Sequence, residues 1–154
     1  MNDFTAISQW ADGMLALLRP EERRRLATRI GRELRRENQR RIAAQQEPDG
    51  KPFAPRKEPL RKSGKRRLRK RGQMFRKLRM AAWLKTRGTP DGATVNFIGA
   101  ASNIARIHHF GLRDVVNLRK GITHQYAARP LLGITDKDAD AIEKAVLQHL
   151  GGGD

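Results

Sequence analysis

The sequence predicts an α+β fold, with long helices in the first half, a small antiparallel sheet and a C-terminal helix. Apolar residues recur at helical intervals from residue 3 to about residue 46, and again after Thr135. Two short β-prone runs flank turn residues at 88–92. Helices, then strands, then a helix is an order typical of α+β domains. The 154 residues fit a single α+β domain spanning 1–154.

Two helices are expected near the N-terminus. Residues 3–18 carry apolar side chains at near-helical spacing, and Asp3 is placed to cap the first turn. A longer helix is expected to begin at Pro20, because proline suits a first helical turn, and to run to about residue 46.

A basic loop is expected after the long helix. Residues 47–60 are rich in turn residues, and residues 56–71 are dominated by Lys and Arg, with Glu58 as the only acid. Because like charges repel and such a segment buries little apolar surface, we predict that 47–72 is a mobile loop within the domain. Its candidate contacts with DNA or with a partner ring are Arg61, Lys62, Lys65, Arg66, Arg67, Arg69, Lys70 and Arg71.

A helical pattern and a hairpin are expected next. Met74, Phe75 and Leu78 repeat a helical spacing. Residues 80–86 and 94–98 then read as two strands of a β-hairpin, joined by a loop near 88–92. A short helix is expected to follow from residue 102 or 103 to about 109, ended by Gly111.

The last third alternates weak and strong signals. Residues 111–127 show no clear period and are predicted to be an extended loop. Residues 128–133 form a short apolar run, which Pro130 restricts to an edge strand. Thr135 is expected to cap the final helix. The predicted core consists of Leu26, Ile30, Leu34, Ile104, Ile107, Leu131, Leu132, Ile142 and Val146.

The charge is high and unevenly distributed. The formal net charge is +17, and residues 1–79 hold 24 basic and 9 acidic residues against 9 and 7 in residues 80–154. Such an excess predicts contact with nucleic acid, an acidic protein surface or a membrane surface. With no cysteine, no spanning apolar run and no signal peptide, a chain soluble in the cytoplasm, without a membrane partner, is expected.

Catalytic and metal-binding patterns are weak. His108 and His109 are adjacent, so on a helix they face different directions and suit one metal ion poorly. Asp136, Asp138 and Asp140 lack the glycine and glutamate that a calcium loop requires, and they suit a helix start better. Phosphate-binding loops and serine hydrolase motifs are also absent from the sequence. We therefore expect a non-enzymatic protein without cofactor or metal.

Four segments together resemble one phage family. The segments Ile104–Gly111 and Ala128–Ile134 carry the main motif, and Pro48–Phe53 and Thr94–Gly99 support it. Their order and spacing resemble the tail completion protein S family, also called phage virion morphogenesis proteins, over about residues 20–150. The basic content of 56–72 is heavier than that family's pattern.

The resemblance implies assembly rather than chemistry. Members of the family are expected in the tail or neck of the virion, where they complete the tail and help join it to the head. It implies other tail, neck and connector proteins as partners, a homo-oligomeric ring that is often hexameric, and assembly in the bacterial cytoplasm. The motif residues either make the fold or form a subunit interface: Ile104, Ile107, His108, Phe110, Gly111, Arg129, Pro130 and Leu131.

The charge leaves an alternative open. A stand-alone basic nucleic-acid-binding protein would explain the net charge of +17, although no base-reading motif accompanies it. Any contact between the basic run and phage DNA should be non-specific and should weaken as salt rises.

Overall fold

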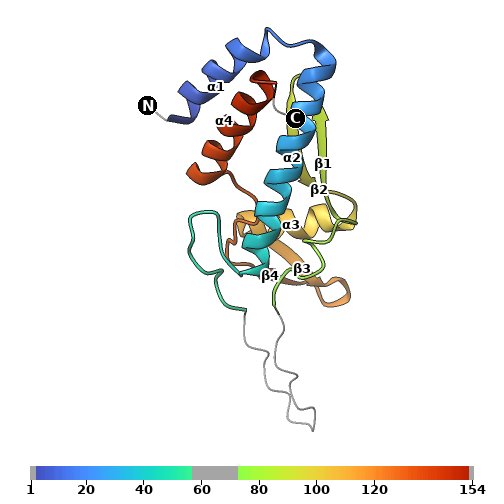
Figure 1. Ribbon diagram of the computed structural model, residues 1–154. Helices are drawn as coiled ribbons and strands as arrows, with labels where there is room; N and C mark the ends of the chain where they lie inside the picture. Colours follow the sequence, from blue (N-terminus) through green and yellow to red (C-terminus); the bar gives the residue numbers. More distant parts are fainter. Residues whose placement is uncertain (1–2, 57–72, 153–154) are drawn as a thin grey trace.

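The computed structural model describes residues 3–56 and 73–152 and arranges them as an α+β fold (Figure 1). Instead of one small sheet, this part of the chain has two separate two-stranded antiparallel sheets. In chain order the elements are α1 (Asp3–Leu15), α2 (Pro20–Ala43), β1 (Leu84–Thr89), β2 (Gly92–Phe97), α3 (Ala100–Phe110), β3 (Arg113–Asn117), β4 (Ile122–Gln125) and α4 (Asp136–Leu150).

The long helix α2 forms the centre of the fold. It packs against the β1–β2 hairpin on one side and against α4 on another, while α1 lies beside α4 (Figure 1). Ile30, expected in its apolar stripe, is only half-buried. Because α2 faces two neighbours, its buried arc is wider than one stripe and includes small and polar residues: Leu26, Ala27, Gly31, Leu34, Asn38 and Ile42.

Small residues let α2 and the first hairpin approach closely. A Cβ added to Gly88 would lie 2.5 Å from the backbone nitrogen of Thr28, and one added to Gly31 would lie 2.3 Å from Thr86 Oγ1. A side chain at Gly88 would therefore meet backbone that cannot move aside. Glycine at these positions sets the distance between helix and strand.

The first hairpin follows the prediction, with a shorter loop. Strands β1 and β2 pair in register from Leu84 opposite Phe97 to Thr89 opposite Gly92, so only two residues connect them. Leu84 and Phe97 are buried and join the hydrophobic core. That core lies between the C-terminal half of α2, this hairpin and α3, and consists of Ile42, Phe53, Leu78, Leu84, Phe97, Ala101, Ala105 and Leu131.

The predicted extended loop at 111–127 is wrong, because this segment forms a second hairpin. Strand β3 pairs with β4 in antiparallel fashion, and a short 3₁₀ turn at Leu118–Lys120 connects them. The side chain of Asn117 accepts a hydrogen bond from the Lys120 N–H at 3.1 Å, which closes the turn. Since most side chains of the hairpin stay exposed, the sequence carries no inward–outward alternation to reveal it.

The predicted edge strand at 128–133 is also wrong. This segment has no regular secondary structure. The Arg129 N–H donates to the His108 carbonyl at 2.7 Å, the Leu131 N–H to His109 Nδ1 at 3.1 Å, and the Gly133 N–H to Asn38 Oδ1 at 3.0 Å. These separate bonds take the place of the regular ladder that a strand would have used.

The helical pattern at residues 74–78 corresponds to a series of turns. Phe75 has a φ of 61°, a left-handed conformation that interrupts a right-handed helix. Gln45 holds the segment in place, because its side chain accepts from the Met74 N–H at 2.7 Å and donates to the Met74 carbonyl at 3.0 Å. Leu78 nevertheless reaches the core.

The sequence predicted the bounds of the last two helices better than it predicted which of their side chains are buried. Helix α3 begins at Ala100 rather than at residue 102 or 103, and it ends at Gly111, whose φ is 63°. Of its two expected core residues Ile107 is buried, whereas Ile104 is 48% exposed, and the motif residue Phe110 is 64% exposed.

Helix α4 is capped as expected. The Thr135 hydroxyl accepts from the Asp138 N–H at 3.2 Å, and Asp138 accepts in return from the Thr135 N–H at 2.9 Å. The buried Asp138 carboxylate also pairs with Arg41 at 2.7 Å, tying α4 to α2. Among the described residues, none of the helices combines the length and apolar character that a membrane span requires.

Candidate functional site

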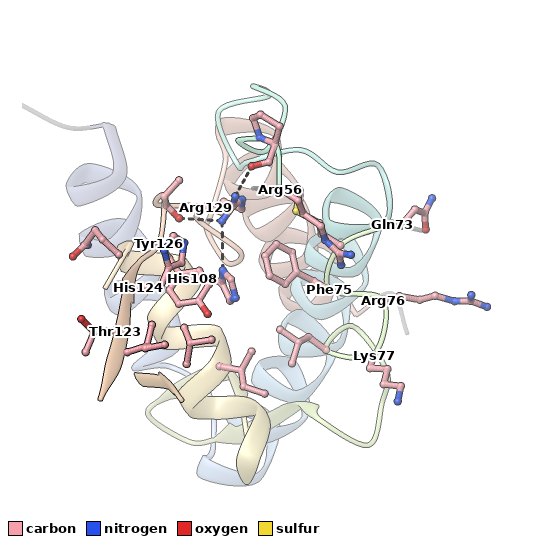
Figure 2. A pocket seen from close by; sticks show the side chains of 18 residues that line it. Arg56, Gln73, Phe75, Arg76, Lys77, His108, Thr123, His124, Tyr126 and Arg129 are labelled. Atoms are coloured by element: carbon pink, nitrogen blue, oxygen red, sulfur yellow. Dashed lines mark hydrogen bonds between the residues drawn. The ribbon is translucent and has the colours of Figure 1, made fainter. Parts of the chain in front are cut away.

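A hollow on the described surface lies between the turns at 73–78, helix α3 and the β3–β4 hairpin. We call it the hairpin groove (Figure 2). Its volume is about 1030 Å³. It is lined by Pro55, Arg56, Gln73, Met74, Phe75, Arg76, Lys77, Leu78, Ile104, His108, Val116, Ile122, Thr123, His124, Gln125, Tyr126, Ala127 and Arg129.

Aromatic rings form the base of the hairpin groove. The ring of Phe75 lies edge-on to that of His108, with centroids 5.0 Å apart. His108 in turn meets Tyr126 at 4.7 Å, and Tyr126 meets His124 at 4.7 Å. Figure 2 shows Phe75, His108 and Tyr126 facing the hollow, whereas Arg76 and Lys77 extend away from it. The result is an apolar and aromatic floor with a basic rim.

A buried arginine supports one wall of the groove. The Arg129 guanidinium donates to the backbone carbonyls of Ala54 at 2.6 Å, Pro55 at 2.8 Å and Ala127 at 3.2 Å. Burial lowers the pKa of Arg129, and the positive charge of Arg56 lowers it further. Because arginine stays protonated in proteins, its fork of donors holds three carbonyls at once and joins residues 54–55 to the segment after β4.

Helix α3 carries two adjacent half-buried histidines, of which His108 lines the groove. Burial lowers the pKa of His108, and the charges of Arg129 and Arg56 act in the same direction against a smaller opposing effect of Asp114. Burial also lowers the pKa of His109, whose Nδ1 accepts the Leu131 N–H. Both imidazoles are therefore neutral at physiological pH and act as packing and hydrogen-bonding groups.

The lining suits binding better than catalysis. Among the described lining residues there is no carboxylate, so acid–base chemistry between paired carboxylates is not available in the groove. Nor do the described residues bring together three His, Cys, Asp or Glu side chains that could hold a metal ion. Apolar walls with a few polar groups and a basic rim fit a protein segment that carries apolar and acidic side chains.

Comparison with known proteins identifies the relatives of this chain. The sequence pattern of the phage virion morphogenesis family matches residues 2–151. The chain belongs to the phage virion morphogenesis family. It is also 41% identical over 152 residues to the tail completion protein S of Escherichia phage P2, covering 97% of this chain and 99% of that protein. No solved structure gave a significant match.

The motif that carries the family resemblance is divided between the groove and the core. Ile104, His108 and Arg129 line the hairpin groove. Leu131 is buried in the core, Ile107 is buried outside that cluster, and Pro130 is half-buried.

The remaining two motif residues lie at the end of α3. Phe110 is the last residue of the helix and is largely exposed. Gly111 caps the helix so close to Ala128 that a Cβ would lie 2.7 Å from the Ala128 backbone nitrogen. In this virion morphogenesis protein the motif therefore joins the end of α3 to the segment after β4, and three of its side chains also reach the groove.

The predicted basic contacts lie outside the described residues. Arg61 to Arg71 all belong to the 57–72 stretch, so their positions are not described. The described chain stops at Arg56 and resumes at Gln73, and both of these residues line the groove. The two described residues that flank this stretch therefore both lie at the groove.

Sequence reasoning missed the residues that the second hairpin contributes. Val116, Ile122 and Tyr126 line the groove, and Val115 and Leu118 lie nearby on the same hairpin. Leu118 is 89% exposed and Val116 is 60% exposed. Valine and isoleucine beside turn residues were the available signal, but without a buried face they gave no alternation.

Proposed function

We propose that this protein completes the tail during virion assembly and helps join the tail to the head. The main support is the match to the phage P2 tail completion protein S over nearly the full length of both chains. Its partners would be other tail, neck and connector proteins, and its place would be the tail or neck of the virion.

The protein would act as a homo-oligomeric ring. Support comes from apolar side chains that the described fold leaves uncovered on α3 and the β3–β4 hairpin, namely Ile104, Phe110, Val115, Val116, Leu118 and Ile122. Clustered exposed apolar residues on a small protein mark interaction surfaces. In a ring, the hairpin of one subunit would insert beside its neighbour, and cyclic repetition would cover this surface on every copy.

The basic run at 61–71 would face whatever passes or docks at the ring opening. A loop joined to the chain at the groove, with lysine and arginine as its main content, would meet either phage DNA or an acidic partner ring. Many copies in a ring would add such weak contacts together. Contact with phage DNA and contact with an acidic partner ring are both compatible with a ring of this protein.

The ring is tested by substituting the two most exposed large apolar residues of the hairpin. Val116→Asp with Leu118→Asp should convert an oligomer to monomers in sedimentation velocity, because two carboxylates cannot be buried unpaired in an interface. The same variant should fail to complement a phage that lacks the gene. Leu17→Asp, at a position that is 80% exposed outside the hairpin, is the matched control.

Two results would count against the ring. One is a wild-type protein that sediments as a monomer at every concentration. The other is full plaque formation by the double-aspartate variant. If that variant lost its fold, circular dichroism would reveal it, and Leu118→Ser alone would then replace it.

The alternative is a stand-alone nucleic-acid-binding protein, which the net charge of +17 favours. It would bind DNA tightly at 0.15 M salt as a monomer, and the virions would not need it. Normal, infectious particles without this protein would support it over the assembly role.

A further inference from the structure

We propose that the outward face of α2 is a nucleic-acid-binding surface that contacts phosphates along one strand. This surface consists of described residues on the central helix and is separate from the basic run at 61–71. We call it the arginine face, and define it by Arg24, Arg25, Arg29, Arg32 and Arg36.

The spacing of these arginines places most of them in one line. Positions 25, 29, 32 and 36 follow the i, i+4, i+7, i+11 pattern of a single helix face. Eleven residues of helix rise about 16 Å, so one guanidinium appears at nearly every turn along that length. All five arginines are exposed and surround a shallow hollow of about 680 Å³.

The charge of this face is not neutralised within the described part of the chain. The acids of α2 that form ion pairs there use other partners, since Glu22 pairs with Arg19 and Glu37 with Arg40. Glu21 is the only acid that lines the hollow. Of the five arginines, Arg29 donates to the Gln148 side chain at 2.9 Å, a neutral partner.

The composition of the face favours nucleic acid over protein. Its lining holds Thr28 and Glu21 besides the arginines, and no apolar side chain. Stable protein interfaces have an apolar and often aromatic centre, whereas nucleic-acid interfaces are more polar and strongly positive. Arginine also presents a planar fork of donors that matches phosphate oxygens in a bidentate way.

The helix holds the arginines on a rigid support. The opposite side of α2 is anchored by buried Leu26, Leu34 and Ile42 and by the ion pair between Arg41 and Asp138. Little backbone ordering is therefore needed on binding. Because the arginines follow one line along an exposed helix and suit backbone phosphates, we expect binding without sequence preference.

The test measures binding of the full-length protein to a fluorescent 30-base-pair duplex of mixed sequence across a series of salt concentrations. Arg25→Gln, Arg32→Gln and Arg36→Gln are combined in one variant. A control variant combines Arg106→Gln, Arg113→Gln and Arg119→Gln, which are exposed on α3 and the second hairpin. Both variants lose the same three charges, so they differ only in location.

The arginine-face variant should bind more weakly by about tenfold or more at 0.15 M salt. Its slope of log affinity against log salt should fall by about 2.7, or 0.9 for each lost phosphate contact. The control variant should change both quantities far less. Equal effects in the two variants would overturn the proposal, because they would mean that only net charge matters.

A second probe addresses an acidic protein partner. Polyglutamate is used as this probe. If the arginine-face variant loses binding to polyglutamate but keeps binding to the duplex, the proposal is overturned in favour of such a partner. A third variant, with the basic run at 61–71 changed to glutamine, separates the two surfaces, since the arginine face predicts residual DNA binding in it. Should the triple variant fail to fold, the single Arg32→Gln variant keeps the slope measurement, with an expected change of about 0.9. None of these readouts depends on ring formation or plaque formation, so this proposal and the assembly role can fail separately.

Discussion

Arg129 shows how one residue can organise a surface through backbone contacts. Arg129 is 5% exposed, and its guanidinium bonds three carbonyls, of which two belong to residues 54 and 55, more than seventy positions earlier. The described chain stops at Arg56, two residues after Ala54. Arg129 thus fixes the course of the last described residues before the 57–72 stretch, at the edge of the hairpin groove.

Arg129→Lys should destabilise the fold. A lysine ammonium cannot reach the three carbonyls with one planar fork, so buried acceptors would lose their partners. We expect a loss of about 2–3 kcal/mol in the free energy of unfolding, measured by urea denaturation. Arg106→Lys, at an exposed position of α3, should change it by less than about 0.5 kcal/mol. Equal midpoints for the two variants would contradict this role of Arg129.

His109 makes folding stability depend on pH. Its buried imidazole has a lowered pKa, and its Nδ1 must be unprotonated to accept the Leu131 N–H. The unfolded chain therefore binds a proton that the folded chain resists. The stability from this group is complete above the unfolded pKa of about 6.5 and declines as pH falls toward the lower folded pKa.

The matching experiment follows thermal unfolding between pH 7.5 and pH 5. The unfolding temperature of the wild-type protein should fall more over this range than that of His109→Asn, which keeps an acceptor but does not titrate. His108 contributes in the same direction in both proteins. A decline of the same size in both would show that His109 has no part in it.

Residue-level prediction succeeded where the requirement was local. The conformation of Gly111 could be predicted, because a helix ended there and glycine is the residue that tolerates a φ of 63°. The contacts of Arg129 and His109 could not, because their partners are unremarkable backbone groups at distant positions. The residue types of Ala54 and Leu131 give no indication of such a bond, because only their backbone groups take part.

At the scale of elements, the contact between α2 and β1 determines how the fold is assembled. The helix and the strand meet where Gly88 lies against the backbone of Thr28. Besides the Thr28 hydroxyl, the contact includes the backbone nitrogen and Cα of Thr28, which cannot rotate aside as a side chain can. It therefore sets the position of the first hairpin and, through Leu84 and Phe97, the shape of the core.

Gly88→Ala should separate these two elements. The added Cβ would lie under 3 Å from Thr28 backbone atoms, so strand or helix must shift, at a cost of about 1–3 kcal/mol in the free energy of unfolding. Gly92→Ala is the matched control on the same hairpin, because a Cβ there meets nothing within 4 Å. Comparable urea midpoints in the two variants would refute the close packing of α2 on β1.

Elements with a buried face, or with clear turn or capping residues at their ends, were predictable from the sequence. The first hairpin was recognised by its turn residues, and α4 by Thr135 and the acids that suit a helix start. The second hairpin was missed because its residues do not alternate between core and solvent. The exposed side chains that would form the proposed interface are also the reason why the sequence pattern does not reveal this hairpin.

The core prediction shows a related limit. Ile104 and Phe110 share the spacing of Ile107, but α3 buries only the Ile107 side of that face. Periodicity indicates that a helix has an apolar side. It does not indicate whether that side meets the subunit's own core or a partner.

On the scale of the whole molecule, two kinds of surface coexist in the described part of the chain. The hairpin groove and its uncovered hairpin are apolar, and the arginine face of α2 is cationic. The proposed ring would use the first surface, and the proposed contact with nucleic acid would use the second. The family to which the chain belongs, phage virion morphogenesis, accords with that combination.

The most direct test of the assembly role is negative-stain electron microscopy of lysates from a phage lacking this gene. The tail-completion and joining role predicts DNA-filled heads beside separate, unjoined tails, with joining restored by the wild-type gene supplied in trans. Overlong tails would shift the role to length termination. Normal, infectious particles would contradict the central claim and favour the stand-alone nucleic-acid-binding protein.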